Sequence, residues 1–342
     1  MIQRSHKKIQ DRRFMHGMSL PEILAAVLIG LIGMIVIMQV YATSEERKRS
    51  TTGTSDAQIS GNIAMFTLES TIRSAGFGMV SSDSNMVGCT TRAYNSNRAT
   101  PDFSFLMAPV VITVGAGGAP DQIRVIYGDS PYVVTGEEFV AGAASGADFP
   151  LKNAAGMVEG DLVVASETGQ DCSMAEVTGF LPAAVNTVQH AAGISYSYVD
   201  PFGNTISPTA TYNKGGGAGV DYTNAARLFS LGRSPTVMTF QIGNDKLQTK
   251  SLIPYVAAQD ADNDGTTKAD IGDGIVQLKA QYGKDLNGNG VVDANEWNNT
   301  LPPTPPDWMQ VRAVRIALLA RSGQYEKTAV TAAAPTWYGG SF

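Results

Sequence analysis

The chain of 342 residues has little charge and very few histidines and cysteines. Lysine, arginine, aspartate and glutamate together make up 16% of it, and the formal net charge is −6. Because nucleic acids carry a dense negative charge, we expect no nucleic-acid partner for this acidic chain. Two of the three histidines, His6 and His16, lie near the N-terminus, which leaves His190 alone for histidine-based catalysis in the rest of the chain.

Apolar residues make up 43% of the chain, which also contains 36 glycines and 16 prolines. This composition excludes a coiled coil and collagen, and it favours an exported, turn-rich β protein over a cytosolic helical enzyme. The acidic residues are scattered, and no nucleophile stands in a recognisable arrangement with a base. We therefore expect no enzymatic activity.

The N-terminus combines a basic segment with a long apolar run. Residues 1–17 hold five cations and one anion, and residues 23–38 have no polar side chain. Extended to Ala42, the run is long enough for a helix of about 30 Å, the thickness of a bilayer core. The basic segment is expected to stay in the cytoplasm, so that the rest of the chain is exported.

A secretory signal peptide cut after Ala42 is the simplest interpretation of this run. The run is longer than the roughly 7–15 apolar residues of a typical signal peptide. In addition, Glu22 stands at its entrance, where a carboxylate is costly unless it is paired or stays at the membrane interface.

The segment Gly17-Met18-Ser19-Leu20-Pro21-Glu22 before the apolar run resembles the class III signal of type IV prepilins and pseudopilins. The resemblance implies that a prepilin peptidase cuts after Gly17 and methylates Met18. It also places Glu22 at the glutamate position of the mature family. The retained helix would anchor the subunit in the inner membrane, with a periplasmic head. It would later pack against the helices of other major and minor pilins in a fibre at the cell surface.

Buried among such helices, Glu22 would need a cation, and the new α-amino group of Met18, its own or a neighbour's, is the nearest candidate.

The resemblance implies an α+β, type IV pilin-like fold, in which a long N-terminal helix packs on an antiparallel β-sheet head with large loop-rich insertions. We expect a leader at 1–17, a transmembrane and filament-core helix at 18–42, an amphipathic continuation at 43–79, and the β-rich periplasmic or extracellular head at 80–342. Apolar residues at helical spacing (Ile59, Ile63, Phe66) support the continuation. Two separate helices, divided near Gly53, are the alternative.

Several short stretches in the head have the apolar alternation of strands. In residues 276–282, Val, Leu, Ala and Tyr alternate with Gln, Lys and Gln, which predicts a strand with one wet side. Residues 301–306 (LPPTPP) are expected to form an extended polyproline spacer. The predicted strands are 121–127, 161–165, 174–180, 236–242, 275–282 and 311–319.

The two cysteines, Cys89 and Cys172, form an isolated pair. In an exported protein such a pair is expected to form a disulfide, and two separate thiols are the alternative.

Residues 285–296 match the calcium-loop pattern D-x-[DN]-x-[DN]-G-x5-E at every fixed position. A calcium ion takes six to eight oxygens, and this spacing supplies them around one centre, with Gly290 at the sharp turn. A polar turn between strands is the alternative. The expected ligands are the side chains of Asp285, Asn287 and Asn289, the carbonyl of Val291, Asp293 directly or through water, and both oxygens of Glu296.

Residues 260–265 match the first half of the same pattern. Position twelve is then Ile271, which has no ligand atom in its side chain, so that Asp270 or Asp273 would have to substitute. A solvated acidic turn is the alternative for this stretch.

Three further stretches (71–78, 272–283 and 308–322) resemble the PilW family of type IV minor pilins. The resemblance implies a low-abundance subunit that primes pilus assembly near the fibre tip, with a tip adhesin among its partners, in a fibre of the kind used for cell adhesion and twitching motility. The J-type minor pseudopilin of type II secretion, which has an EF-hand-like calcium region, is the first alternative. A membrane-anchored adhesin or sugar-binding module is the second.

Overall fold

The computed structural model describes residues 18–79, 86–130, 135–181, 186–200, 202–324, 331 and 333–342. Gly17 and the rest of the expected leader lie outside the described residues. The chain divides into two compact units, residues 1–53 and residues 54–342.

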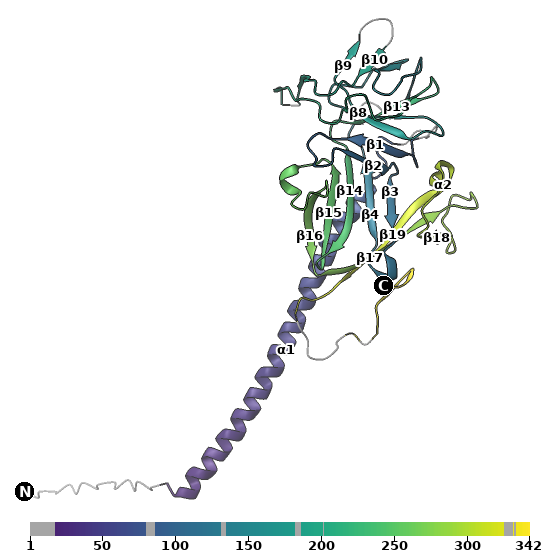
Figure 1. Ribbon diagram of the computed structural model, residues 1–342. Helices are drawn as coiled ribbons and strands as arrows, with labels where there is room; N and C mark the ends of the chain where they lie inside the picture. The colour runs from purple at the N-terminus through teal and green to yellow at the C-terminus, as the bar shows by residue number, and fades with distance from the viewer. Residues whose placement is uncertain are drawn as a thin grey trace, which may run out of the picture. The chain divides into compact units, whose positions relative to one another are not determined.

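Helix α1 runs without a break over Leu20–Arg73 (Figure 1). Its apolar N-terminal part is long and apolar enough to cross a membrane, and none of that part is buried. Gly53 lies inside the helix and does not end it, so one helix forms where two were the alternative. The helix ends at Arg73, short of residue 79, and turns that include Gly76 and Gly78 at positive φ (80° and 76°) complete the expected segment.

Within the unit 54–342, the end of α1 buries one face against strands. Ala64 and Leu68 are fully buried in a core that also holds residues of β17 (Ile275–Lys284). The approach is close, because a methyl group at Gly61 would lie 3.4 Å from the Cβ of Ala320 at the end of β19 (Val311–Ala320). The helix lobe, defined as residues 54–79, 108–127 and 236–324, is built on this contact.

Two antiparallel sheets form the helix lobe, with strand orders β16-β15-β14-β4-β3 and β18-β17-β19 (Figure 1). In β17 the side chains of Leu278, Ala280 and Tyr282 are buried and those of Gln277, Lys279 and Gln281 are partly exposed, which confirms the predicted alternation over residues 277–282. Val276, predicted on the buried face, is partly exposed. The remaining elements are β3 (Val110–Thr113), β4 (Gln122–Tyr127), β14 (Thr236–Gly243), β15 (Lys246–Ile253), β16 (Thr267–Asp273), β18 (Trp297–Asn298), α2 (Pro305–Met309), η1 (Ala116–Gly118) and η2 (Ala257–Gln259).

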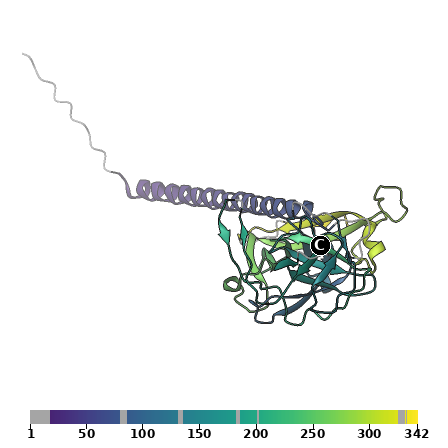
Figure 2. The same ribbon diagram turned by 90° about the horizontal axis from the view of Figure 1, so that it is seen from above.

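The second lobe, defined as residues 89–106 and 135–232, contains a sheet of strand order β2-β1-β8-β7-β13-β5. Strands β1 and β8 are parallel and the other pairs are antiparallel. The two lobes belong to the single compact unit 54–342, and their strands overlap when the molecule is seen from above (Figure 2). The elements are β1 (Thr90–Tyr94), β2 (Asp102–Leu106), β5 (Glu137–Glu138), β7 (Leu162–Ser166), β8 (Cys172–Glu176) and β13 (Arg227–Gly232).

Small two- and three-stranded sheets complete the fold. They are formed by β6 (Phe149–Leu151), β9 (Gly179–Leu181) and β10 (Asn186–Gln189), by β11 (Tyr198–Val199) and β12 (Thr205–Ile206), and near the C-terminus by β20 (Thr336–Trp337) and β21 (Gly340–Ser341).

Two predictions about local structure are wrong. The predicted strand 174–180 is two strands in different sheets, because the Thr178 N–H donates to the Gln189 carbonyl and turns the chain into the smaller sheet. Residues 301–306 are not a polyproline spacer throughout. Pro305 and Pro306 occupy the first turn of α2, where a missing backbone N–H costs nothing, and Thr304 and Asp307 form its capping box.

Candidate functional site

The disulfide joins Cys89, directly before β1, to Cys172, the first residue of β8. The Cα atoms are 5.8 Å apart, and the two cysteines are 83 positions apart in the sequence. Closing so long a loop restricts the unfolded chain, which the chain-entropy model values at roughly 4–5 kcal/mol. The bond therefore fixes the only parallel strand pair among the described strands.

His190, the one histidine outside the N-terminal segment, has a structural environment. Its Nε2 lies 2.8 Å from the Ala147 carbonyl oxygen, and its ring stacks on Phe149 with centroids 4.3 Å apart.

The sequence has two acidic loops, which we call the first loop (residues 260–265) and the second loop (residues 285–296). The second loop folds around two buried carboxylates. Asp285 directly follows β17 and is 5% exposed. Its Oδ1 accepts the N–H of Asn289 and its Oδ2 accepts the N–H of Gly290, both at 3.0 Å. Gly290 has a φ of 84°, a conformation that glycine adopts without strain. The sharp turn predicted at this glycine is therefore present.

Glu296 closes the second loop from its other end and is 3% exposed. Its Oε1 accepts the N–H of Leu286 at 3.0 Å, and its Oε2 accepts the N–H of Asp293 at 2.8 Å. Among the described residues, no lysine or arginine pairs with this carboxylate. A buried carboxylate bonded only to backbone N–H groups keeps lone pairs for a further cation.

The middle of the second loop supplies amide oxygens and a third carboxylate. Asp293 Oδ2 accepts the amide NH2 groups of Asn287 (3.0 Å) and Asn289 (3.4 Å). The Val291 N–H donates to Asn289 Oδ1 at 2.8 Å. These hydrogen bonds tie Asn287 and Asn289 to Asp293, but the carboxylate oxygens of Asp285, Asp293 and Glu296, all among the described residues, do not lie within 4.8 Å of one another as those of the first loop do.

The charge of the second loop is only partly balanced by the protein. Of its three carboxylates, only Asp285 has a cation within ion-pair distance among the described residues: Arg312, whose Nε is 3.9 Å from Asp285 Oδ2 and whose side chain is 60% exposed. Hard carboxylate and amide oxygens are the ligands that calcium prefers. The donor set of the loop therefore fits a calcium ion.

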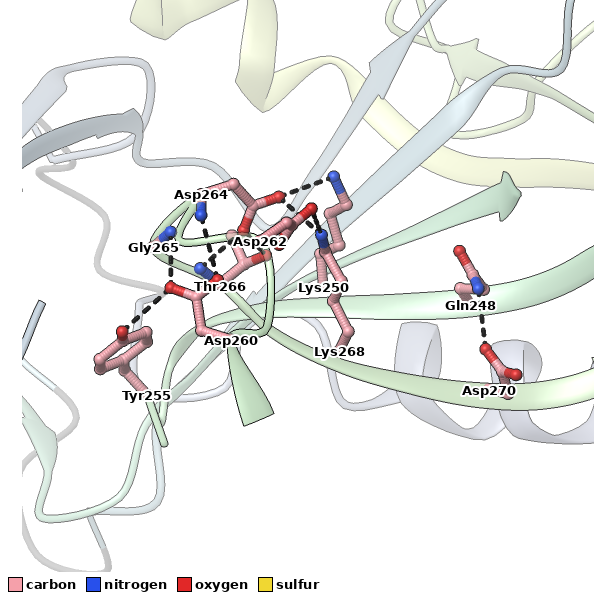
Figure 3. Close-up of polar contacts among 10 residues, drawn as sticks. All are labelled: Gln248, Lys250, Tyr255, Asp260, Asp262, Asp264, Gly265, Thr266, Lys268 and Asp270. Carbon is pink, nitrogen blue, oxygen red and sulfur yellow. Dashed lines mark hydrogen bonds and ion pairs between the residues drawn. The ribbon is translucent and has the colours of Figure 1, made fainter. Parts of the chain in front are cut away.

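The first loop, residues 260–265, begins with the same hydrogen bonds. Asp260 is 4% exposed, and its two oxygens accept the N–H groups of Asp264 (3.0 Å) and Gly265 (2.9 Å), as Asp285 accepts those of Asn289 and Gly290. Figure 3 shows this turn, with the Tyr255 hydroxyl also donating to Asp260. The matching half-pattern in the sequence therefore produces a matching turn.

Two lysines from the neighbouring strands β15 and β16 contact the carboxylates of the first loop. Carboxylate oxygens of Asp260, Asp262 and Asp264 lie within 4.8 Å of one another. Lys250 Nζ lies 3.1 Å and Lys268 Nζ 3.0 Å from Asp264 Oδ2, and Lys268 also contacts Asp262 (Figure 3). The protein itself supplies the cations here.

The aspartates of the first loop offset the repulsion between the two lysines. Lys250 on β15 and Lys268 on β16 are directly opposite in the antiparallel register, where two like charges repel. Burial alone would raise the pKa of Asp264, but hydrogen bonds from Thr266, Lys268 and Lys250 hold this pKa below its ordinary value. The loop and the lysine pair stabilise each other.

The expected substitutes at position twelve of the first loop do not reach it. Asp270 and Asp273 both pair with Lys246, at 2.9 and 3.0 Å, and Ile271 packs against the core of the helix lobe. Sequence reasoning missed the two lysines of the first loop. Their opposed positions could have been found only from the pairing of β15 with β16.

Helix α1 has a second apolar face in the head. Ile59, Ile63 and Phe66 are 55%, 52% and 72% exposed. At 100° per residue they lie on the side of the helix opposite Ala64 and Leu68, which are fully buried. The end of α1 therefore presents apolar side chains both to the sheet and to solvent.

At the N-terminal end of α1, Met18 and Glu22 are described and exposed. The Ser19 N–H lies 3.4 Å from Glu22 Oε2, a weak capping contact in the first turn. Among the described residues, no cation pairs with Glu22.

A helix long and apolar enough to cross a membrane, continued into an antiparallel β head, is the architecture of a type IV pilin-like α+β protein. Residues 239–341 match the model of the family described as PilW, type IV pilus-assembly protein W. This match confirms the PilW resemblance at residues 272–283 and 308–322, does not reach the third stretch, 71–78, and supports a role related to type IV pilus assembly. It includes both candidate loops and does not extend to α1 or the second lobe. No curated protein and no solved structure matches the chain.

Proposed function

We propose that this chain is a minor pilin, a structural subunit that helps to prime assembly of a type IV pilus and lies near the fibre tip. Prepilin peptidase would remove the leader after Gly17 and methylate Met18. The subunit would wait in the inner membrane with its head in the periplasm, and would then join other major and minor pilins, with a tip adhesin among its partners. The chain acts as a structural part and not as an enzyme.

The observation that carries this proposal is the second apolar face of α1. Ile59, Ile63 and Phe66 form a second exposed apolar patch on the same helix, separated from its membrane-length part by the polar stretch 43–58. Burying apolar side chains of this kind is favourable by roughly 25 cal/mol per Å² of apolar surface, and this free energy is not gained while they face water. Packing against the apolar helix of another subunit would bury them, which supports assembly through α1.

Glu22 supports the same role through its charge. A carboxylate in an apolar helix bundle is destabilising unless it meets a cation. The α-amino group created by cleavage after Gly17 supplies one at the required end of the helix. Such a pair would set the register between subunits.

The proposal is tested by comparing aspartate substitutions at two exposed phenylalanines. Phe66→Asp places a charge on the proposed helix interface, whereas Phe202→Asp changes a residue that is 90% exposed in a loop of the second lobe. We expect Phe66→Asp to remain at the wild-type level in the membrane and to be lost from sheared fibres, and Phe202→Asp to be incorporated. The readout is an immunoblot of both fractions. Normal incorporation of Phe66→Asp would contradict the proposal.

We also propose that the second loop binds calcium. The support is its donor set: two buried carboxylates, a third carboxylate and two amides, with one peripheral arginine nearby. Asp285, Asn287, Asn289, Val291, Asp293 and Glu296 would hold the ion. By drawing both ends of the loop together, calcium would fix the connection between β17 and β18.

A further inference from the structure

The second lobe has a groove of mixed polar and apolar lining along the strand pair β1 and β2, with a volume of about 500 Å³. Because side chains two apart on a strand share a face, the floor of the groove is fixed by the pairing of the two strands. Arg92 lies opposite Ser104, and Tyr94 lies opposite Asp102. Thr90 extends the same face.

One wall of the groove is the glycine-rich segment 214–219, and its backbone is held in place. Ser145 Oγ donates to the Gly216 carbonyl at 3.0 Å and accepts the Gly219 N–H at 2.9 Å. A methyl group at Gly217 would lie 2.2 Å from the backbone nitrogen of Gly146, so only glycine allows this approach. The glycine run therefore builds a fixed wall.

The charged side chains of the groove are already paired with one another. Arg92 contacts Asp171 through Nε at 2.8 Å and through Nη2 at 2.7 Å, and its Nη1 donates to the Gly219 carbonyl at 3.2 Å. Lys214 Nζ lies 2.8 Å from Asp102 Oδ1. A charged ligand would have to break one of these ion pairs, so the groove favours a ligand without net charge.

Three hydroxyl groups on the floor are available to a ligand. The side chains of Thr90, Tyr94 and Ser104 make no hydrogen bond to another residue within the described part of the chain. Tyr94 also offers a partly exposed aromatic ring beside the paired charges. Free hydroxyls, paired charges with spare acceptor oxygens and one aromatic face match a ligand rich in hydroxyl groups that also has an apolar side.

We propose that this groove is a binding site for a neutral saccharide. The Tyr94 ring packs against the C–H face of a sugar ring, and the hydroxyls of Thr90, Tyr94 and Ser104, with Asp102, bond to the sugar hydroxyls. The second lobe lies outside the residues that match the PilW family, 239–341. This inference does not depend on fibre assembly.

The test uses the full-length chain, purified in a detergent whose headgroup is not a sugar and displayed on streptavidin through a C-terminal biotin tag. The probe is a printed array of neutral, sialylated and sulfated oligosaccharides. We expect binding to neutral members of the array. For the neutral sugar that binds best, Tyr94→Ala and Ser104→Arg should each weaken binding by at least about tenfold, a change of about 1.4 kcal/mol.

Two matched controls make the same kinds of change elsewhere. Tyr338→Ala truncates a tyrosine that is 93% exposed, and Ser55→Arg introduces an arginine at an exposed serine of α1 in the helix lobe. Both should bind as the wild type does. Tyr94→Phe keeps the ring and loses the hydroxyl, so it decides the matter if Tyr94→Ala does not fold: it should lose about two- to tenfold, the value of one hydrogen bond.

Absence of binding to every glycan would overturn the site, as would binding confined to acidic glycans. If a neutral oligosaccharide still binds to Ser104→Arg and to the variants at Tyr94, it binds elsewhere on the protein and the proposed site is wrong.

Discussion

The two acidic loops of the helix lobe begin with the same turn and differ in the source of their positive charge. In each, the first aspartate accepts backbone N–H groups from positions five and six, and a glycine at position six has positive φ. The first loop holds Lys250 and Lys268. Among the described residues, no lysine side chain contacts the second loop, which ends instead in the buried carboxylate of Glu296.

This difference shows that the D-x-[DN]-x-[DN]-G pattern specifies a turn and does not by itself specify a metal site. Short-range Asx hydrogen bonds stabilise the turn in both loops. What distinguishes them is the surroundings: two opposed lysines on neighbouring strands at the first loop, and a twelfth residue with two ligand oxygens at the second. We therefore expect calcium dependence at the second loop alone.

The largest expected effect is the loss of calcium-dependent stability on changing Glu296→Ala. For sites of the extracellular type, with Kd near 10⁻⁴–10⁻³ M, 10 mM calcium stabilises by about 1.4–2.7 kcal/mol. That corresponds to a rise in melting temperature of roughly 3–10 °C for a head of this size. The measurement is thermal unfolding of the full chain in calcium and in chelator, where Glu296→Ala should show no difference.

The matched control for this prediction is Asp262→Ala, which removes a carboxylate from the first loop. It should keep the full calcium response. If chelator leaves the wild-type melting temperature unchanged, the second loop does not bind calcium; a response lost in Asp262→Ala would move the site to the first loop.

A smaller effect is expected from Lys268→Met, which removes one cation from the first loop. Because the lysine side chain is 28% exposed, the loss should be about 0.5–1 kcal/mol at neutral pH. The pKa of Asp262 and that of Asp264 lie below their ordinary values in the folded chain, and Lys268 has a raised pKa. The contribution is therefore complete between roughly pH 4 and pH 10, and is lost as pH falls through the lowered carboxyl values or rises through the raised lysine value.

Denaturant unfolding of the wild type and of Lys268→Met across this pH range checks the prediction. Lys48→Met, which removes a lysine from α1 outside the head, is the control and should match the wild type. A difference between Lys268→Met and wild type that persists in strong acid would mean that the lysine stabilises the fold by packing and not by charge.

The sequence was sufficient for the features that depend on local patterns. The apolar run predicted α1, the alternation in residues 276–282 predicted β17, and the spacing of 285–296 predicted the turn at Gly290. The features it could not supply depend on long-range pairing. The opposition of Lys250 and Lys268, and the groove between β1 and the segment 214–219, both require knowing which strands and loops are neighbours.

Two of the local predictions were wrong because a nearby interaction overrode the pattern. The strand expected at 174–180 divides where Thr178 bonds to Gln189. The prolines expected to extend the chain at 301–306 instead begin α2, because Thr304 and Asp307 cap it.

The most direct test of the proposed function is the mass of the N-terminal peptide of the mature protein from cells. If the apolar helix is retained for assembly, that peptide begins at Met18 and carries one N-terminal methyl group. A mature chain that begins at Thr43 would contradict the account, because the helix that carries it would have been removed.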